Sequence, residues 1–112
     1  MKYKIVLVPF PFDDLSGKKV RPAICLTPTI GTYKHVIIAF ITSQVHLASE
    51  PSDLVIQTTD KNFSLTGLKV DSAVRLHRLV TIPKRIILRQ LGELPINFQT
   101  LVEAKLKTLF SI

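Results

Sequence analysis

The stretch from Ile5 to Leu26 limits the possible folds most, because IVLVPFPFDDLSGKKVRPAICL reads as a strand, a polar loop and a second strand. Apolar runs occupy its two ends, and short apolar runs bounded by turn residues are typical of buried strands. The Asp, Ser and Gly residues between them favour a turn, since Asp and Ser bond nearby backbone groups and Gly accepts positive φ. The sequence therefore predicts a polar loop over residues 13–19, mounted rigidly between two core strands.

The rest of the chain predicts more short strands followed by one helix. Strands are expected over residues 4–10, 22–27, 33–42, 53–58 and 69–79, with a last one ending at Gly92. From Asn97, the expected N-cap, apolar residues take the spacing of one helix face. No crossover helix separates the early strands, which argues against a parallel sheet. We expect a mainly β fold with a C-terminal α-helix in one domain spanning residues 1–112, either a compact antiparallel β-barrel or a twisted sheet capped by the helix.

Charge and cysteine content narrow the class of protein. The net charge of +7 in 112 residues suggests a polyanionic partner, either nucleic acid or an acidic protein segment, although solubility alone would also explain it. Cys25 is the only cysteine and lies in an apolar run, so a buried structural thiol is expected. The longest later apolar run is far shorter than the ~20 residues of a spanning helix. The sequence predicts a cytoplasmic protein with no membrane contact.

The spacing of polar residues disfavours metal and cofactor chemistry. His35, His46 and His77 lie in separate segments, and the glycines form no phosphate-binding loop. What remains is metal-free and cofactor-free acid–base and electrostatic chemistry on a phosphodiester. In RNA, the 2′-hydroxyl can attack the neighbouring phosphate if one group removes its proton, another protonates the leaving oxygen and a cation stabilises the added charge. DNA lacks this hydroxyl, so the mechanism would select RNA.

Two polar groups at strand ends are candidates for this chemistry. Arg21 suits the cationic role, because its planar, permanently charged guanidinium matches phosphate oxygens. Thr42, Ser43 and Gln44 emerge from the end of an apolar strand and can hydrogen-bond a phosphate. Simpler roles are an ion pair between Arg21 and an aspartate of the 13–19 loop, and capping of backbone groups by the two hydroxyls.

Further candidates lie in the loop and on a later strand. Ser16, Lys18 and Lys19 can contact phosphates, although the two lysines also suit a solvated loop. Alternation along 69–79 places Arg75 and His77 on one face, about 7 Å apart along the backbone. His77 is of a residue type that suits proton transfer, but a histidine is more often simply solvated or half-buried.

The order of these motifs resembles the MazF/PemK-type toxins of bacterial type II toxin–antitoxin systems. The resemblance runs over nearly the whole chain, through the 5–26 stretch, AFITSQ, GLKVDSAVRLHRLVTI, LGEL and the C-terminal helix. Its most specific part is the Ser-Gly loop followed by Arg21-Pro22-Ala23, supported by Ile41-Thr42-Ser43.

The resemblance implies an SH3-like β-barrel homodimer that cuts single-stranded RNA at specific sequences without a metal. Such enzymes leave a 2′,3′-cyclic phosphate and a 5′-hydroxyl. By motif, Arg21 corresponds to the arginine acting on the scissile phosphate, Thr42 to the threonine beside it, and Arg75 to a proton donor or phosphate contact. Two residues further on, members can carry an aspartate as general base, whereas this chain has His77.

Two other functions fit the same fold. A CcdB-like barrel binds gyrase, and a stand-alone barrel could bind RNA without cutting it, although the chain has no Trp and few aromatic residues for stacking bases. Charge also predicts a partner. A toxin this basic should be neutralised by an acidic, partly disordered antitoxin segment that folds as it binds.

Overall fold

The computed structural model describes residues 1–10 and 19–112 and contains, within them, six strands, three short 3-10 segments and one α-helix. The strands are β1 (Lys4–Pro9), β2 (Val20–Cys25), β3 (His35–Thr42), β4 (Asp53–Ile56), β5 (Ser72–Pro83) and β6 (Arg89–Glu93). The 3-10 segments are η1 (Val45–Leu47), η2 (Phe63–Thr66) and η3 (Lys84–Ile86), and the helix is α1 (Ile96–Phe110).

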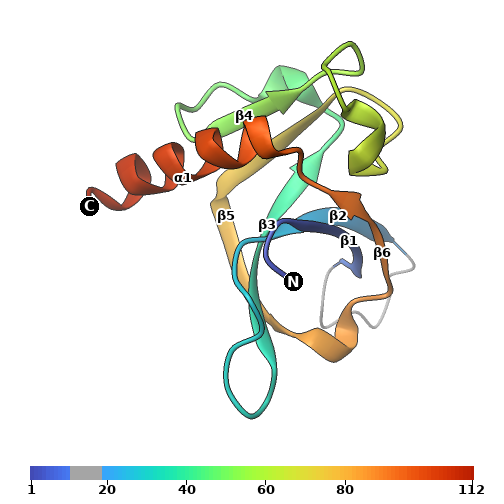
Figure 1. Ribbon diagram of the computed structural model, residues 1–112, viewed down its shortest axis with the longest axis vertical. Helices are drawn as coiled ribbons and strands as arrows, with labels where there is room; N and C mark the ends of the chain where they lie inside the picture. The colour runs from blue at the N-terminus through green and yellow to red at the C-terminus, as the bar shows by residue number, and fades with distance from the viewer. Residues whose placement is uncertain (11–18) are drawn as a thin grey trace.

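The strands form one curled antiparallel sheet in the order β4-β5-β3-β2-β1-β6. Figure 1 shows the sheet bending round so that β6 lies across from the long strand β5, while α1 lies beside β4 and β5 at one end. The predicted mainly β fold with a C-terminal helix is confirmed. In the described part of the chain the outer strands, β4 and β6, do not pair with each other, so the barrel is only partly closed.

Apolar side chains pack on both faces of the central strands. On β3, Ala39 and Ile41 join the cluster that contains Phe98 and Val102 of α1, whereas Ile38 joins a second cluster on the opposite face. Burial on both faces was expected from the apolar middle of this strand, and each fully buried aliphatic side chain stabilises the fold by about 1.5–3 kcal/mol. Cys25 is fully buried, as predicted, and burial raises its thiol pKa to about 11.

Most element boundaries predicted from the sequence are off by one or more residues, and two of the differences have a clear physical reason. The strand expected over 69–79 runs from Ser72 to Pro83, because its second half pairs with the first half of β3. The helix begins at Ile96 with Pro95 at the N-cap, two residues before the predicted N-cap, so Asn97 is already helical. Proline is compatible with this position because the first N–H groups of a helix have no intrahelical partner.

The β3–β5 pairing contains an irregularity that matters for the site. Ala39 pairs with Leu79, but the next residue, Phe40, pairs with Arg75. Residues 76–78 of β5 therefore have no partners on β3, and the strand bulges at this point. A bulge turns side chains away from simple alternation.

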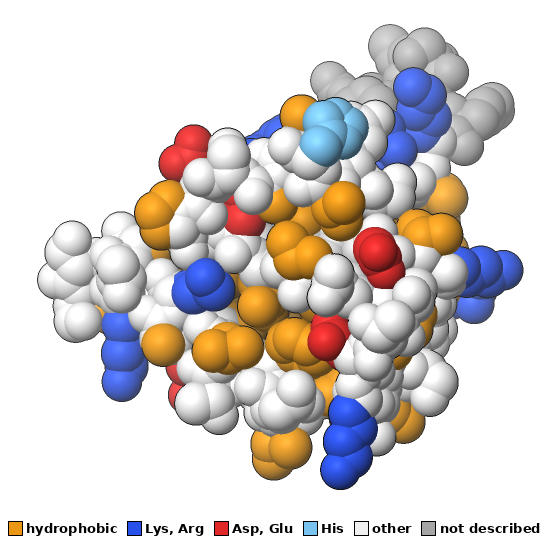
Figure 2. All heavy atoms as spheres, turned by 90° about the horizontal axis from the view of Figure 1, so that it is seen from above, with side chains coloured by type: hydrophobic (Ala, Val, Ile, Leu, Met, Phe, Trp, Pro, Cys, Tyr) orange, Lys and Arg blue, Asp and Glu red, His pale blue; other side chains and the backbone are white. Residues whose placement is uncertain are grey.

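The end of the molecule that carries β4 and α1 exposes apolar side chains. Figure 2, seen from above relative to Figure 1, shows hydrophobic side chains in the middle of this surface and Lys and Arg side chains mostly toward its edge. On these elements Val55, Leu101 and Phe110 are exposed by 40%, 45% and 55%. The single chain therefore leaves part of its apolar surface uncovered.

Candidate active site

The register of β2 and β3 places Arg21 and Thr42 directly across from each other, where the two strands stop pairing. The two strands pair through Cys25–Ile38, Ile24–Ala39 and Ala23–Phe40, and pairing stops there. Pro22 follows on β2, and a proline cannot donate a ladder hydrogen bond. Two positions past the last pair, in the same register, are Arg21 and Thr42. Their side chains therefore stand where two supported strands separate.

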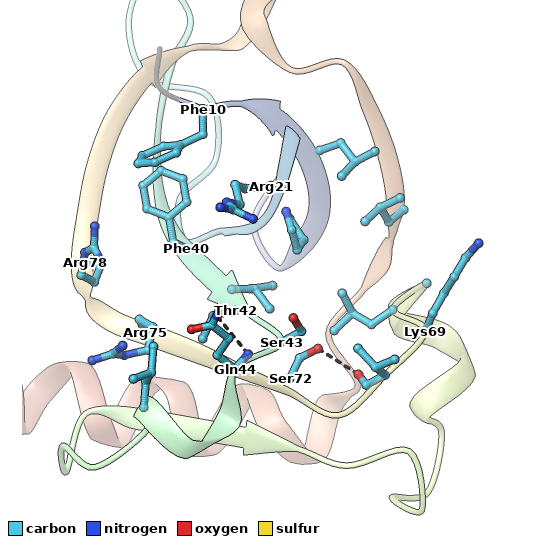
Figure 3. Close-up of a pocket in the computed structure, with 18 of the residues that line it drawn as sticks. Phe10, Arg21, Phe40, Thr42, Ser43, Gln44, Lys69, Ser72, Arg75 and Arg78 are labelled. Atoms are coloured by element: carbon cyan, nitrogen blue, oxygen red, sulfur yellow. Dashed lines mark hydrogen bonds between the residues drawn. The ribbon is translucent and has the colours of Figure 1, made fainter. Parts of the chain in front are cut away.

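A pocket of about 480 Å³ opens at this separation, and both residues line it. Figure 3 shows Arg21 above and Thr42, Ser43 and Gln44 below, facing the same cavity. The polar part of the lining comes from four strands, β2, β3, β5 and β6, and from short segments next to β3 and β5. Among the described residues, the lining is formed by Leu7, Phe10, Arg21, Pro22, Phe40, Ile41, Thr42, Ser43, Gln44, Leu47, Gly67, Leu68, Lys69, Val70, Ser72, Arg75, Arg78, Arg89 and Leu91.

The charge of the pocket is positive. Among residues 1–10 and 19–112, five cationic residues and no Asp or Glu line it; they are Arg21, Lys69, Arg75, Arg78 and Arg89. Arg21 is exposed and forms no ion pair with any described residue. Its alternative partners, Asp13 and Asp14, lie outside the described residues. A concave surface lined by positive charge concentrates anions, so the pocket suits a phosphate-bearing ligand.

The hydroxyl of Thr42 is oriented by the backbone that follows it. The backbone N–H of Gln44 donates to Thr42 Oγ1 over 3.1 Å. This contact uses an acceptor position of the oxygen and leaves the hydroxyl hydrogen available for a ligand. Ser43 and Gln44 are exposed at the pocket, so all three strand-end residues predicted from the sequence face the same space.

The remaining predicted residues divide between the pocket and its surroundings. Arg75 lines the pocket, but His77, although exposed, is not among its described lining residues. The His77 ring instead contacts Ser52 and Arg75: Nδ1 lies 3.0 Å from Ser52 Oγ, and Nε2 lies 3.4 Å from Arg75 Nη2. The placement of both on one face, predicted from alternation, agrees with this contact.

The loop residues are placed in part. Lys19 is exposed next to β2, and its carbonyl accepts a hydrogen bond from the backbone N–H of Phe10 over 3.1 Å. It is not among the pocket residues that the structure describes. Ser16 and Lys18, also predicted to bind RNA, lie outside the described residues.

Sequence patterns did not identify three of the cations. Alternation from Arg75 would turn Arg78 to the opposite face, but the bulge over residues 76–78 brings both into the pocket lining. Arg89 reaches the pocket because the sheet curls, which brings β6 across from β5 (Figure 1). Lys69 precedes β5, and in Figure 3 it lies at the edge of the pocket opposite Arg75 and Arg78. The only sequence feature that pointed to these cations was the positive net charge, which predicted a polyanionic partner.

The pocket also has an aromatic wall. Phe10 and Phe40 contact each other edge to face, with ring centroids 5.1 Å apart and an interplanar angle of 76°. Both line the pocket above Thr42 in Figure 3. Aromatic rings beside cations are suited to a ligand that has both a planar base and a phosphate.

No three His, Cys, Asp or Glu side chains of the described residues lie close enough together to hold a metal ion. No helix among these residues has the length and apolar content needed to cross a membrane.

Comparison with known proteins supports one family. Residues 1–110 match the family model described as PemK-like, MazF-like toxin of type II toxin–antitoxin system. No curated protein sequence matches the chain.

Solved structures share the fold. The Mycobacterium tuberculosis toxin MazF-mt6 is 21% identical, with a TM-score of 0.72 and 97% of each chain covered. MazF from Deinococcus radiodurans is also 21% identical, with a TM-score of 0.72, 99% of this chain and 96% of that chain covered. An endoribonuclease in complex with its cognate antitoxin, from a mycobacterial species, is 16% identical, with a TM-score of 0.69, 100% of this chain and 93% of that chain covered.

Proposed function

Because the chain belongs to the PemK-like, MazF-like toxin family of type II toxin–antitoxin systems, we propose that it is a metal-independent endoribonuclease that cleaves single-stranded RNA at specific sequences. The observation that carries the proposal is the convergence of Arg21 and Thr42 in one cationic pocket. The solved neighbour that is described as an endoribonuclease has the same fold.

In the proposed reaction the RNA provides the nucleophile. A general base takes the proton of the 2′-hydroxyl as its oxygen bonds to the adjacent phosphorus, while the bond from phosphorus to the 5′-oxygen breaks and a general acid gives that oxygen a proton. The products are a 2′,3′-cyclic phosphate and a 5′-hydroxyl. Arg21 stabilises the charge that develops on the non-bridging oxygens, and the Thr42 hydroxyl donates to the same oxygens.

The other predicted residues hold the RNA around this centre. Ser43 and Gln44 contact the phosphate or sugar next to the scissile bond, Arg75 binds a phosphate oxygen, and Lys19 binds the strand outside the pocket. His77 was predicted to transfer a proton, but its ring contacts Arg75 and is not among the described residues that line the pocket; we therefore propose that it acts on the reaction through that guanidinium. Since the protein's own cations neutralise the phosphate, the reaction requires no metal.

The test is cleavage of a mixed-sequence RNA by the purified protein in EDTA. Arg21→Ala and Thr42→Ala should each lower the cleavage rate by about 100- to 1,000-fold, the usual cost of losing one donor to a developing anion. Arg85→Ala and Thr59→Ala are matched controls at exposed sites outside the pocket and should cleave like wild type. Melting curves establish that each variant is folded.

Intact RNA at high wild-type concentration would refute the proposal. Binding without cleavage would then favour an RNA-binding barrel, and the absence of both would favour a protein-binding, CcdB-like barrel. Full activity of folded Arg21→Ala and Thr42→Ala would also refute the assignment of these residues.

The same charge supports the proposed partner, an acidic antitoxin segment that covers the pocket. Such a segment would compete with RNA for the five cations, so a synthetic acidic peptide from a neighbouring antitoxin gene should inhibit cleavage and lose potency as salt rises. Inhibition by a segment without acidic residues would argue against this mode. We also propose a homodimer, supported by the uncovered apolar side chains on β4 and α1; light scattering after size exclusion would measure it.

A further inference from the structure

A buried carboxylate lies directly behind the pocket. Asp53 is the first residue of β4, pairs with Arg75 in the β4–β5 register, and has a side chain only 2% exposed. Its Oδ1 accepts a hydrogen bond from Arg75 Nε over 2.7 Å. Its Oδ2 accepts from the backbone N–H of Glu50 over 3.0 Å. Both oxygens of this carboxylate are therefore occupied and fixed.

The ion pair differs from the two other salt bridges that Lys or Arg side chains form among the described residues. The pairs of Lys2 with Glu103 and of Lys4 with Glu93 span 3.9 and 3.8 Å, with both partners substantially exposed. Exposed pairs of this kind contribute little to stability. The Asp53–Arg75 pair is shorter and largely buried, so removing one partner leaves the other charge without compensation in a low-dielectric site.

The second edge of the Arg75 guanidinium is also held. Arg75 Nη2 lies 3.4 Å from His77 Nε2, and a guanidinium can only donate. His77 Nε2 can accept in this contact when the hydrogen of the ring is on Nδ1, and Nδ1 lies 3.0 Å from Ser52 Oγ and 3.8 Å from Asp53 Oδ1. Asp53 and His77 thus contact Arg75 directly, and Ser52 contacts the His77 ring.

The backbone that carries Ser52 and Asp53 is itself anchored. Lys105 of α1 donates through Nζ to the carbonyl oxygen of Pro51 over 2.8 Å. The contacted arginine lies at the start of the β5 bulge, where residues 76–78 have no partners on β3. The residues that follow Arg75 have no partners on β3, so the contact with Asp53 of β4 fixes the position of the Arg75 side chain.

We propose that Asp53 is a positioning residue that holds the Arg75 guanidinium in the pocket wall, with Ser52 and His77 holding its second edge. The inference rests on the function proposed above. Because Asp53 uses Nε and His77 contacts Nη2, Nη1 and the second hydrogen of Nη2 remain to meet a phosphate, and the arginine loses little conformational entropy when RNA binds. Asp53 does not touch the RNA; it determines where the positive charge stands.

The experiment measures kcat and KM on a fluorogenic single-stranded RNA for wild type, Asp53→Asn, Arg75→Ala and the double variant. Asp53→Asn should lower kcat/KM at least tenfold, mainly through kcat, and the double variant should be no worse than Arg75→Ala, because the carboxylate acts only through the arginine. Asp60→Asn is the matched control: Asp60 also accepts a backbone N–H, that of Gln57 over 2.7 Å, but lies outside the described pocket lining.

A purely structural role predicts a different pattern. The loss in activity would then track the fall in melting temperature, and it would multiply with that of Arg75→Ala in the double variant. Either result, or Asp53→Asn cleaving within twofold of wild type, would overturn the inference while wild-type cleavage still supports the proposed function. Intact RNA with wild-type protein would overturn both.

His77→Ala provides a second test that leaves the buried carboxylate paired, in case Asp53→Asn does not fold. It should lower kcat about threefold alone and cause no further loss in the Arg75→Ala background. Unchanged kcat, or a further loss in that background, would overturn the inference; the latter would indicate that the imidazole itself carries a proton.

Discussion

The salt dependence of RNA binding can be worked out from the cations of the pocket. Each phosphate neutralised on a single strand changes the slope of log affinity against log salt by about −0.7. If all five cationic residues named in the pocket lining bind phosphates, the slope is about −3.5. Raising sodium chloride fourfold, from about 50 to about 200 mM, should then weaken binding about 100-fold.

The assay is fluorescence anisotropy with a labelled single-stranded oligonucleotide that has 2′-O-methyl groups, which cannot react by the proposed route. Arg78→Ala and Arg89→Ala should each reduce the magnitude of the slope by about 0.7. Arg85→Ala is the matched control, because it removes an exposed arginine outside the described pocket lining and should leave the slope unchanged.

Two results would refute this reasoning. A slope smaller in magnitude than about 1 for wild type would show that the pocket cations do not bind the phosphates. An equal change of slope for Arg85→Ala and Arg78→Ala would show that overall charge, rather than the pocket, attracts the RNA.

Three further predictions concern the fold. The Cys25 thiol should react slowly with iodoacetamide in the native protein and quickly in denaturant; because burial raises its pKa from 9.0 to about 11, stability should fall as pH rises through this interval, where the unfolded thiol ionises first. Gly92→Ala should destabilise the protein by about 3 kcal/mol in urea denaturation, since its Cβ would lie 2.2 Å from a backbone oxygen of η2. Gly31→Ala, where nothing lies within 4 Å, should cost only about 1 kcal/mol for its positive φ; equal losses would contradict this reasoning. Val102→Ala should cost about 2 kcal/mol, because this residue is fully buried between α1 and the sheet, whereas Leu101→Ala, 45% exposed, should cost much less in the same denaturation assay.

Local patterns predicted the parts of the site that depend on neighbouring residues in the chain. Arg21 lies at the start of a strand after a polar loop, and Thr42 ends an apolar strand, so strand ends made both candidates, and the family resemblance gave them their roles. The structure explains why they meet: the β2–β3 pairing stops at Ala23 and Phe40, and the same register continues to these two residues.

The role of His77 depended on contacts that alternation could not reveal. Its position beside Arg75 follows from the strand period, but the ring contacts Ser52 as well, and Asp53 approaches Arg75 from a neighbouring strand. Ser52 and Asp53 are more than twenty positions from His77 and Arg75 in the chain. They lie beside β5 because of the order of strands in the sheet, which local propensity does not encode.

The sequence by itself determined the mainly β class, the terminal helix, the buried cysteine and the two strand ends that carry Arg21 and Thr42, because each follows from turn chemistry or hydrophobic period over a few residues. Only the tertiary structure decided that Arg78 and Arg89 join them and that Asp53 lies behind Arg75. A bulge and the curl of a sheet depend on how distant strands pair, and it is this long-range register that gathers separate charges into one pocket.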